Sequence, residues 1–197
     1  MLKRLFDILC SFTGLLLLSP LLILVSLWVG LGSRGGVFYR QTRVGKNNTD
    51  FKLFKFRTMY TGADKKGLLT VGGRDPRITP AGYYLRRYKL DELPQLLNVL
   101  FGSMSLVGPR PEVRKYVALY NEEQKKVLLV KPGITDYASL EYFSENDLLA
   151  ASPDPEKTYI EEVMPAKLAL NKKYISEAGL STDLKIIFRT VKRIFAS

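Results

Sequence analysis

Two adjacent carboxylates, Asp91 and Glu92, follow directly on a stretch rich in cations, "LRRYKL". A carboxylate beside Arg or Lys can attack phosphorus or hold a hard metal ion, because the cations neutralise a phosphate substrate. The chain has no His and a single Cys, Cys10, so the commonest general base and the usual zinc ligands are missing. We therefore expect carboxylate chemistry on a phosphate, assisted by Lys, Arg and a hard ion. An ordinary helix cap with an acidic first turn is the alternative for this pair.

The elements on either side of the carboxylates are predicted helices. Thr79 followed by Pro80 is typical of a helix start, and this helix carries Arg86. Asp91 can then cap a second helix, whose positive end suits a phosphate. Five leucines at a spacing of three and four predict a buried face for that helix: Leu90, Leu93, Leu96, Leu97 and Leu100.

A further cation lies ten residues beyond Leu100, in "SLVGPRPE". Arg110 stands between Pro109 and Pro111, so its guanidinium is carried on a stiff, extended backbone. Such a guanidinium suits bidentate contact with phosphate oxygens. This placement favours the phosphate hypothesis over a simple helix cap at the carboxylates.

An uncharged segment of 26 residues, 8–33, precedes these motifs. As one straight helix it would measure about 39 Å, enough to cross a hydrocarbon core of roughly 30 Å. Pro20 predicts a kink in mid-segment, and Ser19 beside it can bond a carbonyl that the proline leaves free. Cations flank both ends, which favours a re-entrant helix-break-helix entering and leaving through one leaflet. A kinked transmembrane helix remains the alternative.

The net charge of +11 gathers around this segment. Residues 1–60 hold nine Lys or Arg and two Asp or Glu, a pattern of a basic collar at a membrane rather than of a nucleic-acid binder. Residues 183–197 form a basic amphipathic helix, which either contacts the membrane surface or docks on the core. Residues 37–59 read as a β-hairpin, with Lys52, Lys55 and Arg57 expected on a solvated face.

We therefore predict an α+β fold with a re-entrant membrane helix, a small hairpin and several amphipathic helices at the membrane interface. The expected organisation is one structural unit with three parts. Residues 1–36 form the membrane helix and basic collar, 37–182 the catalytic domain, and 183–197 the amphipathic C-terminal helix.

The motifs together resemble the monotopic phosphoglycosyl transferases, bacterial sugar transferases that begin glycoconjugate assembly. The resemblance runs from "KRLFDILCSFTGLLLLSPL" through "FYRQTRVG", "FKLFKFRTM" and "LDELPQLLNVLFGSMSLVGPRPE" to "KPGIT" and "DLKIIFRTVKRIF". It implies transfer of a phosphosugar from a UDP-sugar to polyprenyl (undecaprenyl) phosphate, with release of UMP. The expected location is the cytoplasmic face of the bacterial inner membrane, with the lipid bilayer as a partner and no nucleic acid.

The resemblance also implies roles for individual residues. Asp91 corresponds to the nucleophile that forms a covalent phosphosugar intermediate, and Glu92 to the residue that assists Mg²⁺. Arg110, Arg86 and Lys55 are expected to bind substrate phosphate. Ser19 and Pro20 correspond to the break in the family's re-entrant helix.

One stretch departs from the family pattern. Residues 136–146, "DYASLEYFSEN", stand where many relatives carry a Gly-Trp-Ala-Gln-like stretch and a Gly-Arg-Asn turn. The sugar, the glycan pathway and the polyprenol length therefore do not transfer from the resemblance, and the oligomeric state stays open, a homo-oligomer included. The alternative function is a membrane-associated scaffold or basic binding protein without turnover.

Overall fold

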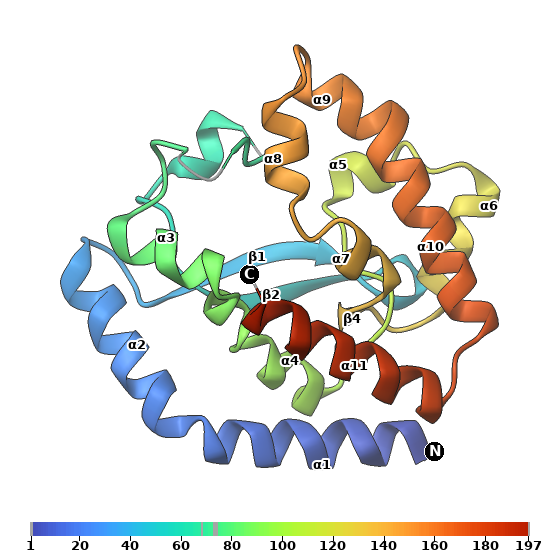
Figure 1. Cartoon of the computed structure of the whole chain (residues 1–197), viewed down its shortest axis with the longest axis horizontal. Coiled ribbons are helices and arrows are strands. Elements are labelled where there is room, and N and C mark those ends of the chain that lie inside the picture. Colours follow the sequence, from blue (N-terminus) through green and yellow to red (C-terminus); the bar gives the residue numbers. More distant parts are fainter. Residues whose placement is uncertain (1, 68, 73–74, 197) are drawn as a thin grey trace.

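The computed structural model describes residues 2–67, 69–72 and 75–196 and is a mixed structure dominated by helices (Figure 1). The helices are α1 Leu2–Leu17, α2 Ser19–Gly32, α3 Pro80–Arg87, α4 Gln95–Phe101, α5 Arg114–Val117, α6 Glu122–Lys125, α7 Tyr137–Glu141, α8 Glu145–Ala150, α9 Pro155–Thr158, α10 Met164–Ser176 and α11 Leu180–Phe195. The strands are β1 Phe38–Val44, β2 Asp50–Phe56, β3 Ser105–Val107 and β4 Gly133–Thr135. This arrangement agrees with the predicted α+β class.

The helix break falls at the predicted residues. The helices α1 and α2 meet at an angle of 63°. Pro20 cannot donate a backbone hydrogen bond to Leu16, and the Ser19 hydroxyl donates to the Leu16 carbonyl instead, at 2.8 Å. Among the described helices, none alone has the length and apolar character to cross a membrane, but the bent pair together meets that measure.

The first turns of α1 are fastened to the rest of the chain by charged side chains. Asp7 is only 2% exposed, and it accepts hydrogen bonds from the Ser105 hydroxyl at 2.9 Å and the Leu106 amide at 3.1 Å. Arg4 donates to the Val99 carbonyl at 2.6 Å. Lys3 pairs with the buried Asp183 of α11. Two cations of the predicted collar therefore hold α1 against the folded domain.

The hairpin forms as predicted. The strands β1 and β2 are antiparallel, in a register that places Phe38 opposite Phe56 and Val44 opposite Asp50. The amide of Asn98 on α4 completes the outer edge of β2, accepting from the Phe54 N–H at 2.9 Å and donating to the Lys52 carbonyl at 2.8 Å. A side chain thus covers an edge that would otherwise be open to pairing.

The expectation that Lys52, Lys55 and Arg57 lie on a solvated face is wrong for two of the three. Lys52 is exposed, but Arg57 is 6% exposed and Lys55 points into the molecule. Arg57 donates to backbone carbonyls at the end of α2 and beyond, including Ser33 at 2.8 Å and Gly36 at 2.5 Å. Its charge is used to bind carbonyls that α2 leaves unpaired at its C-terminus.

The leucine periodicity of α4 marks a half-buried face rather than the core face. The fully buried positions of α4 are Gln95, Asn98 and Val99, whereas its three leucines are half-buried, as are Leu90 and Leu93 before it. The leucine side of this helix faces α1, which packs along α4. Leucine spacing alone could not distinguish the domain core from a second apolar helix.

Two glycines bring the short parallel strands β3 and β4 close together. A Cβ atom on Gly133 would lie 2.0 Å from the Gly108 nitrogen, and one on Gly108 would lie 2.6 Å from the Lys131 carbonyl oxygen. Neither position can hold a side chain without moving backbone. The chain leaves this junction as Gly108, Pro109 and Arg110, so the glycines set where Arg110 begins.

The largest buried cluster lies beneath α5, α8 and α10. Its members are Val44, Val113, Tyr116, Val117, Tyr120, Val127, Leu149, Tyr159, Val163, Met164 and Leu168.

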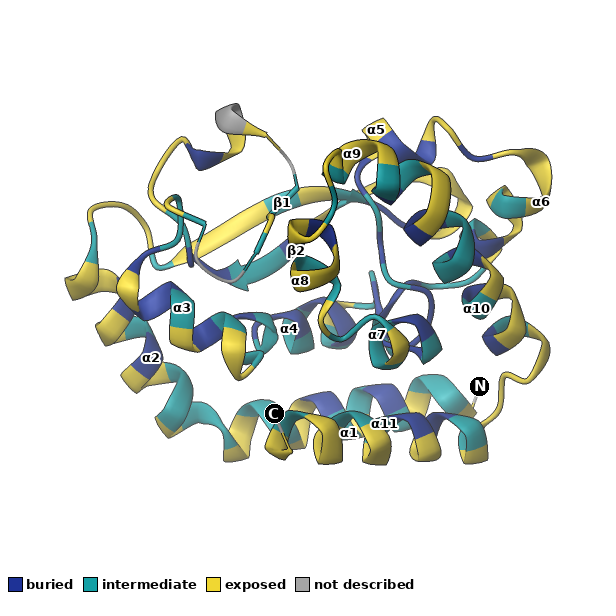
Figure 2. Cartoon of the chain, turned by 45° about the horizontal axis from the view of Figure 1, so that its top comes forward, coloured by how far each residue is buried: buried dark blue, intermediate teal, exposed yellow. Residues whose placement is uncertain are grey.

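The C-terminal helix α11 is amphipathic, and it presents its apolar stripe outward. Ile186 and Asp183 are buried, while Leu184, Phe188, Val191 and Phe195 are exposed. The helix lies on the same side of the molecule as α1, and both carry exposed residues along their outer surfaces (Figure 2). The helix thus docks on the rest of the chain through Ile186 and leaves its apolar stripe exposed.

Candidate active site

The chain reverses direction just before the two carboxylates. Lys89 adopts a left-handed conformation with φ of 55°, and a short 3-10 turn, Leu90–Glu92, follows it. The expectation that Asp91 caps the next helix is wrong, since α4 begins after Pro94 and has no side-chain cap. The reversal turns both carboxylates away from the amides of α4 and toward cations on other elements.

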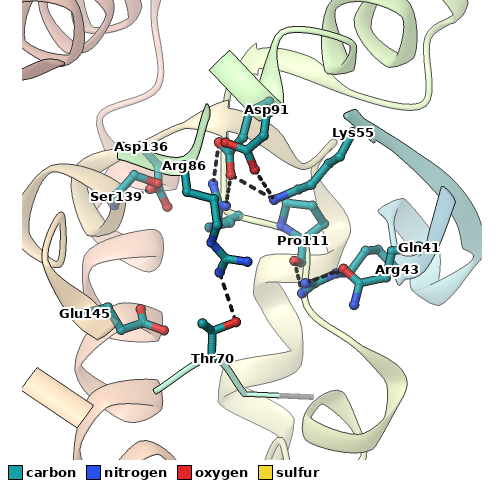
Figure 3. Close-up of polar contacts among 12 residues, drawn as sticks. Gln41, Arg43, Lys55, Thr70, Arg86, Asp91, Pro111, Asp136, Ser139 and Glu145 are labelled. Atoms are coloured by element: carbon teal, nitrogen blue, oxygen red, sulfur yellow. Dashed lines mark hydrogen bonds and ion pairs between the residues drawn. The ribbon is translucent and has the colours of Figure 1, made fainter. Parts of the chain in front are cut away.

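The cations predicted to serve this site do lie around the carboxylates (Figure 3). Lys55 from β2 donates to Glu92 at 2.9 Å, and its nitrogen lies 4.0 Å from an oxygen of Asp91. Arg110 bonds both oxygens of Glu92, with Nη1 at 3.3 Å from Oε2 and Nη2 on Oε1. The three residues come from positions far apart in the sequence, so this cluster is a product of the fold.

Burial and nearby charges shift the pKa values of the two carboxyl groups in opposite directions. Burial raises the pKa of Asp91, and the nearby Lys55 ammonium only partly opposes that rise. Burial acts the same way on Glu92, but the Arg110 guanidinium and the Lys55 ammonium outweigh it and hold the pKa of Glu92 well below its usual range. Glu92 is therefore an anion held closely by two cations, whereas Asp91 has only the longer ion pair with Lys55, at 4.0 Å.

The cations show the complementary effect. Burial lowers the pKa of the Lys55 ammonium, although Glu92 and Asp91 act against this change. The charge of Glu92 raises the pKa of Arg110. Lys55, with its reduced pKa, and the permanently charged Arg110 can each bind a phosphate once that side chain releases Glu92.

A cavity of about 690 Å³ opens beside the carboxylates. Its walls include Asp91, Glu92, Lys55, Arg86 and Arg110, so all five predicted site residues meet at one space. A cavity of this size is in the range of small-molecule and cofactor sites. The structure therefore brings together every residue that the sequence assigned to phosphate chemistry.

Arg86 reaches the cavity from α3. Its Nη2 donates to the Thr70 hydroxyl at 2.9 Å, and its charge weakly opposes the burial that raises the pKa of Asp91. The placement of α3 depends on Gly82, since a Cβ atom there would lie 2.0 Å from the Thr58 carbonyl oxygen. Thr79 caps this helix by accepting from the Gly82 amide at 3.0 Å, as predicted.

Residues that sequence reasoning did not find hold the Arg110 segment. Arg43 on β1 donates to the Pro111 carbonyl at 3.1 Å and to Glu112 at 3.0 Å. Tyr159 donates its hydroxyl to the other oxygen of Glu112. Glu112 directly follows the Pro-Arg-Pro run. The position of an acid there was the signal that the sequence offered.

The carboxylates fit a hard metal ion only with help from a substrate. In the described ranges, 2–67, 69–72 and 75–196, no group of three or more His, Cys, Asp or Glu could hold a metal. Asp91 and Glu92 offer two adjacent carboxylates, and Mg²⁺ commonly takes one or two carboxylates together with substrate phosphates. These carboxylate oxygens therefore fit Mg²⁺ when a diphosphate supplies further oxygen ligands. Arg110 or Lys55 would then move away from Glu92 to make room for the ion.

Comparison with known sequences assigns the family. A family model described as bacterial sugar transferase matches residues 1–197. The chain belongs to the bacterial sugar transferase family.

Individual relatives show how far the match extends. The chain is 38% identical to a UDP-glucose:undecaprenyl-phosphate glucose-1-phosphate transferase of Escherichia coli (strain K12), over 100% of this chain and 41% of the relative. It is 40% identical to the exopolysaccharide production protein PSS of Rhizobium leguminosarum bv. phaseoli, over 96% of this chain and 93% of that protein. It is 35% identical to a UDP-N-acetylgalactosamine-undecaprenyl-phosphate N-acetylgalactosaminephosphotransferase of Aeromonas hydrophila, over 98% and 43%.

The chain thus spans about two fifths of the length of the Escherichia and Aeromonas proteins and most of the Rhizobium one. The names of the first and third of these bacterial sugar transferases include undecaprenyl phosphate, and they differ in the sugar.

Proposed function

We propose that this bacterial sugar transferase moves a sugar phosphate from a UDP-sugar to polyprenyl phosphate and releases UMP. The observation that carries the proposal is the cluster at Asp91: a buried carboxylate held only by a 4.0 Å ion pair, beside an anion that binds two cations, at the wall of a cavity. The names of the Escherichia and Aeromonas relatives support the same substrates.

The proposed first step is attack by a carboxylate oxygen of Asp91 on the β-phosphorus of the donor. A bond forms between that oxygen and phosphorus, and the bond from phosphorus to the oxygen bridging the α-phosphate breaks, with its electron pair leaving on UMP. In the second step a phosphate oxygen of the polyprenyl phosphate attacks the same phosphorus. The bond to Asp91 then breaks and restores the carboxylate.

The surrounding residues lower the cost of bringing anions together. Arg110, Lys55 and Arg86 line the cavity on different sides of Asp91 and are placed to bind diphosphate oxygens. A Mg²⁺ ion bound at Glu92 would supply charge neutralisation of the diphosphate. The raised pKa of Asp91 makes it a better nucleophile once ionised than a carboxylate already locked in an ion pair.

The proposed setting is the cytoplasmic face of a bacterial inner membrane, with α1 and α2 as a re-entrant pair in the lipid bilayer. The bend at Ser19 and Pro20 and the exposed apolar stripe of α11 support this placement. A polyprenyl phosphate held in that bilayer would present its phosphate at the membrane surface.

The test is intact-protein mass spectrometry after incubation with a UDP-sugar in the absence of lipid. The native protein should release UMP in one burst and gain the mass of one phosphosugar. Asp91→Asn should show neither effect, while Glu92→Gln should retain the adduct at a lower rate. Excess EDTA should stop turnover of the native protein.

The matched control is Asp147→Asn, an exposed Asp on α8, which should behave as the native protein. An adduct that persists in Asp91→Asn would identify another nucleophile. Release of UMP only after lipid is added would indicate direct transfer. Absence of turnover with every UDP-sugar would favour the scaffold alternative.

A further inference from the structure

Buried polar atoms without hydrogen-bond partners gather where α7 packs against α10. Within the described part of the chain, these atoms include Asp136 Oδ2 at the start of α7, Ser139 Oγ one turn later, and Asn171 Oδ1 on α10. Asp136 is fully buried and Asn171 is 5% exposed. Leaving such an atom unpaired costs roughly 1–3 kcal/mol, so each needs an explanation.

Two of these residues face the space that Asp91 faces. Ser139 and Asn171 both line the cavity of the carboxylate pair. The backbone amide of Ser139 is already used, since it donates to Asp136 Oδ1 at 2.7 Å, so the Ser139 hydroxyl is not needed to build α7. Figure 3 shows Asp136 and Ser139 together, on the other side of Arg86 from Lys55.

This group of atoms adjoins the phosphate-binding cations. Asn171 and Arg110 also share the wall of a smaller cavity of about 20 Å³ behind Pro111. The charge of Asp136 contributes to the raised pKa of Arg110, which places the two side chains within electrostatic reach. The cavity therefore has cations at the Asp91 end and unpaired oxygen atoms next to them.

The chemistry of the two ends differs. Phosphate oxygens need donors, which Arg110, Lys55 and Arg86 supply. A carboxylate oxygen and an amide oxygen can only accept, and a serine hydroxyl can accept or donate. The ligand group that completes them must carry O–H or N–H donors and must lie next to the phosphate.

We propose that Ser139 and Asn171, backed by Asp136, form the subsite that binds the hydroxyl groups of the donor's sugar. This inference rests on the proposed function. The sugar is bonded directly to the phosphate that Asp91 attacks, so it must occupy the space beside Arg110. The uridine part also carries donors, but a second phosphate separates its ribose and uracil from the phosphate that Asp91 attacks.

The short side chains can reach the cavity by rotation. Ser139 and Asn171 each have alternative staggered rotamers about χ1, separated by about 120°. Rotation exchanges a buried, unpaired position for one facing the ligand, and the hydrogen bond gained there removes the cost of the unpaired atom. Binding of the sugar thereby supplies the hydrogen bonds that these side-chain atoms lack.

The experiment compares Ser139→Ala and Asn171→Leu with the native protein, in detergent or vesicles containing polyprenyl phosphate. We expect each variant to lower kcat/KM for the preferred UDP-sugar by about 3- to 10-fold, the effect of one hydrogen bond of ordinary strength. Inhibition by UMP, which lacks the sugar, should be unchanged. Ser139→Thr keeps the hydroxyl and should retain most of the native rate.

The control is Ser181→Ala, an exposed serine on α11 that does not line the cavity. Equal weakening of UMP and of the UDP-sugar would assign these residues to the uridine part, and unchanged constants for both would mean that the atoms hold only a buried water. Either result would overturn the proposal. A loss of thermal stability in Asn171→Leu leaves Ser139→Ala and Ser139→Thr as the deciding pair.

Binding measurements separate this inference from the proposed function. Calorimetry with UDP-sugar and with UDP gives the affinity contributed by the sugar even in a protein that does not turn over. If the native protein shows no transfer, the proposed function fails. If Ser139→Ala leaves the ratio of the two affinities unchanged, the subsite fails.

Discussion

Replacing Arg57 with Met tests how the bent helix pair is attached to the rest of the chain. The Arg57 guanidinium is almost fully buried at the end of β2 and donates to the Gly36 carbonyl at 2.5 Å, the Ser33 hydroxyl at 2.6 Å and the Ser33 carbonyl at 2.8 Å. Met has nearly the same length and no donor. The substitution therefore removes the hydrogen bonds while keeping most of the packing volume.

The magnitude follows from these contacts. Hydrogen bonds to a charged group contribute roughly 1.5–3 kcal/mol each. Some of the carbonyls are close enough to the surface to regain water, and the buried guanidinium no longer has to be desolvated. Counting two bonds lost without replacement and part of the desolvation cost recovered gives a loss of about 3 kcal/mol, or a fall in Tm of roughly 6–12 °C for a chain of this size.

The assay is thermal unfolding in lipid nanodiscs, with Lys52→Met as the control. Lys52 lies on the same strand and is exposed, and its ammonium bonds only the Thr42 hydroxyl within the described structure. The control should unfold within about 1 °C of the native protein, because exposed substitutions rarely matter. An Arg57→Met protein that unfolds within about 2 °C of the native one would refute the assignment of Arg57 as the attachment point.

The pH profile of kcat/KM should show an acid limb above the ordinary range for an aspartate, because only ionised Asp91 can attack and burial raises its pKa; activity is lost as the pH falls through that value. Lys55→Met should move the limb to still higher pH, and a limb that stays in place would contradict the coupling. Gly82→Ala should destabilise the fold by about 1–3 kcal/mol and displace α3, since the added Cβ meets backbone at 2.0 Å. Gly32→Ala, whose Cβ would meet only ordinary contact at 4.0 Å, should leave Tm unchanged. Pro20→Ala should favour a straight helix, so external labelling of a cysteine introduced at residue 2 should appear only in that variant.

The sequence predicted most of the local structure around the site. The helix start at Thr79, the hairpin and the break at Pro20 each depend on neighbouring residues, and the structure confirms all three. Arg110 and Lys55 were expected to bind substrate phosphate near the carboxylates, and the structure shows both in contact with Glu92. Short-range signals such as caps and proline positions operate over a few residues, so they can be read directly.

The burial of charged groups could not be predicted in the same way. Lys55 and Arg57 alternate with apolar residues in the sequence and resemble the solvated face of a strand, yet Arg57 is buried and Lys55 half-buried because other elements bring them acceptors. Lys3 and Arg4 resemble a membrane collar, but they contact Asp183 and the end of α4. The partners lie between 21 and 180 residues away, beyond any local pattern.

Asp91 shows a third kind of difference. Its residue type and its place before Pro94 suit a helix cap, but the left-handed turn at Lys89 directs the carboxylate elsewhere. Lysine seldom adopts a positive φ, so neither propensity nor spacing indicates this turn. The strained conformation occurs next to the residue proposed to react, where the fold holds it in place.

The fastening of α1 also affects the order in which the chain can assemble. Asp7 can bond Leu106 only after 99 further residues have been synthesised, and Lys3 can pair with Asp183 only after 180 further residues. At synthesis rates of roughly 5–20 residues per second, these intervals are about 5–20 s and about 9–36 s. Until Val99 has been synthesised, none of the charged side chains of this leucine-rich helix can contact its final partner. The ribosome therefore completes the apolar helix well before the residues that hold it in place are made. We expect this helix to need lipid or a chaperone during synthesis.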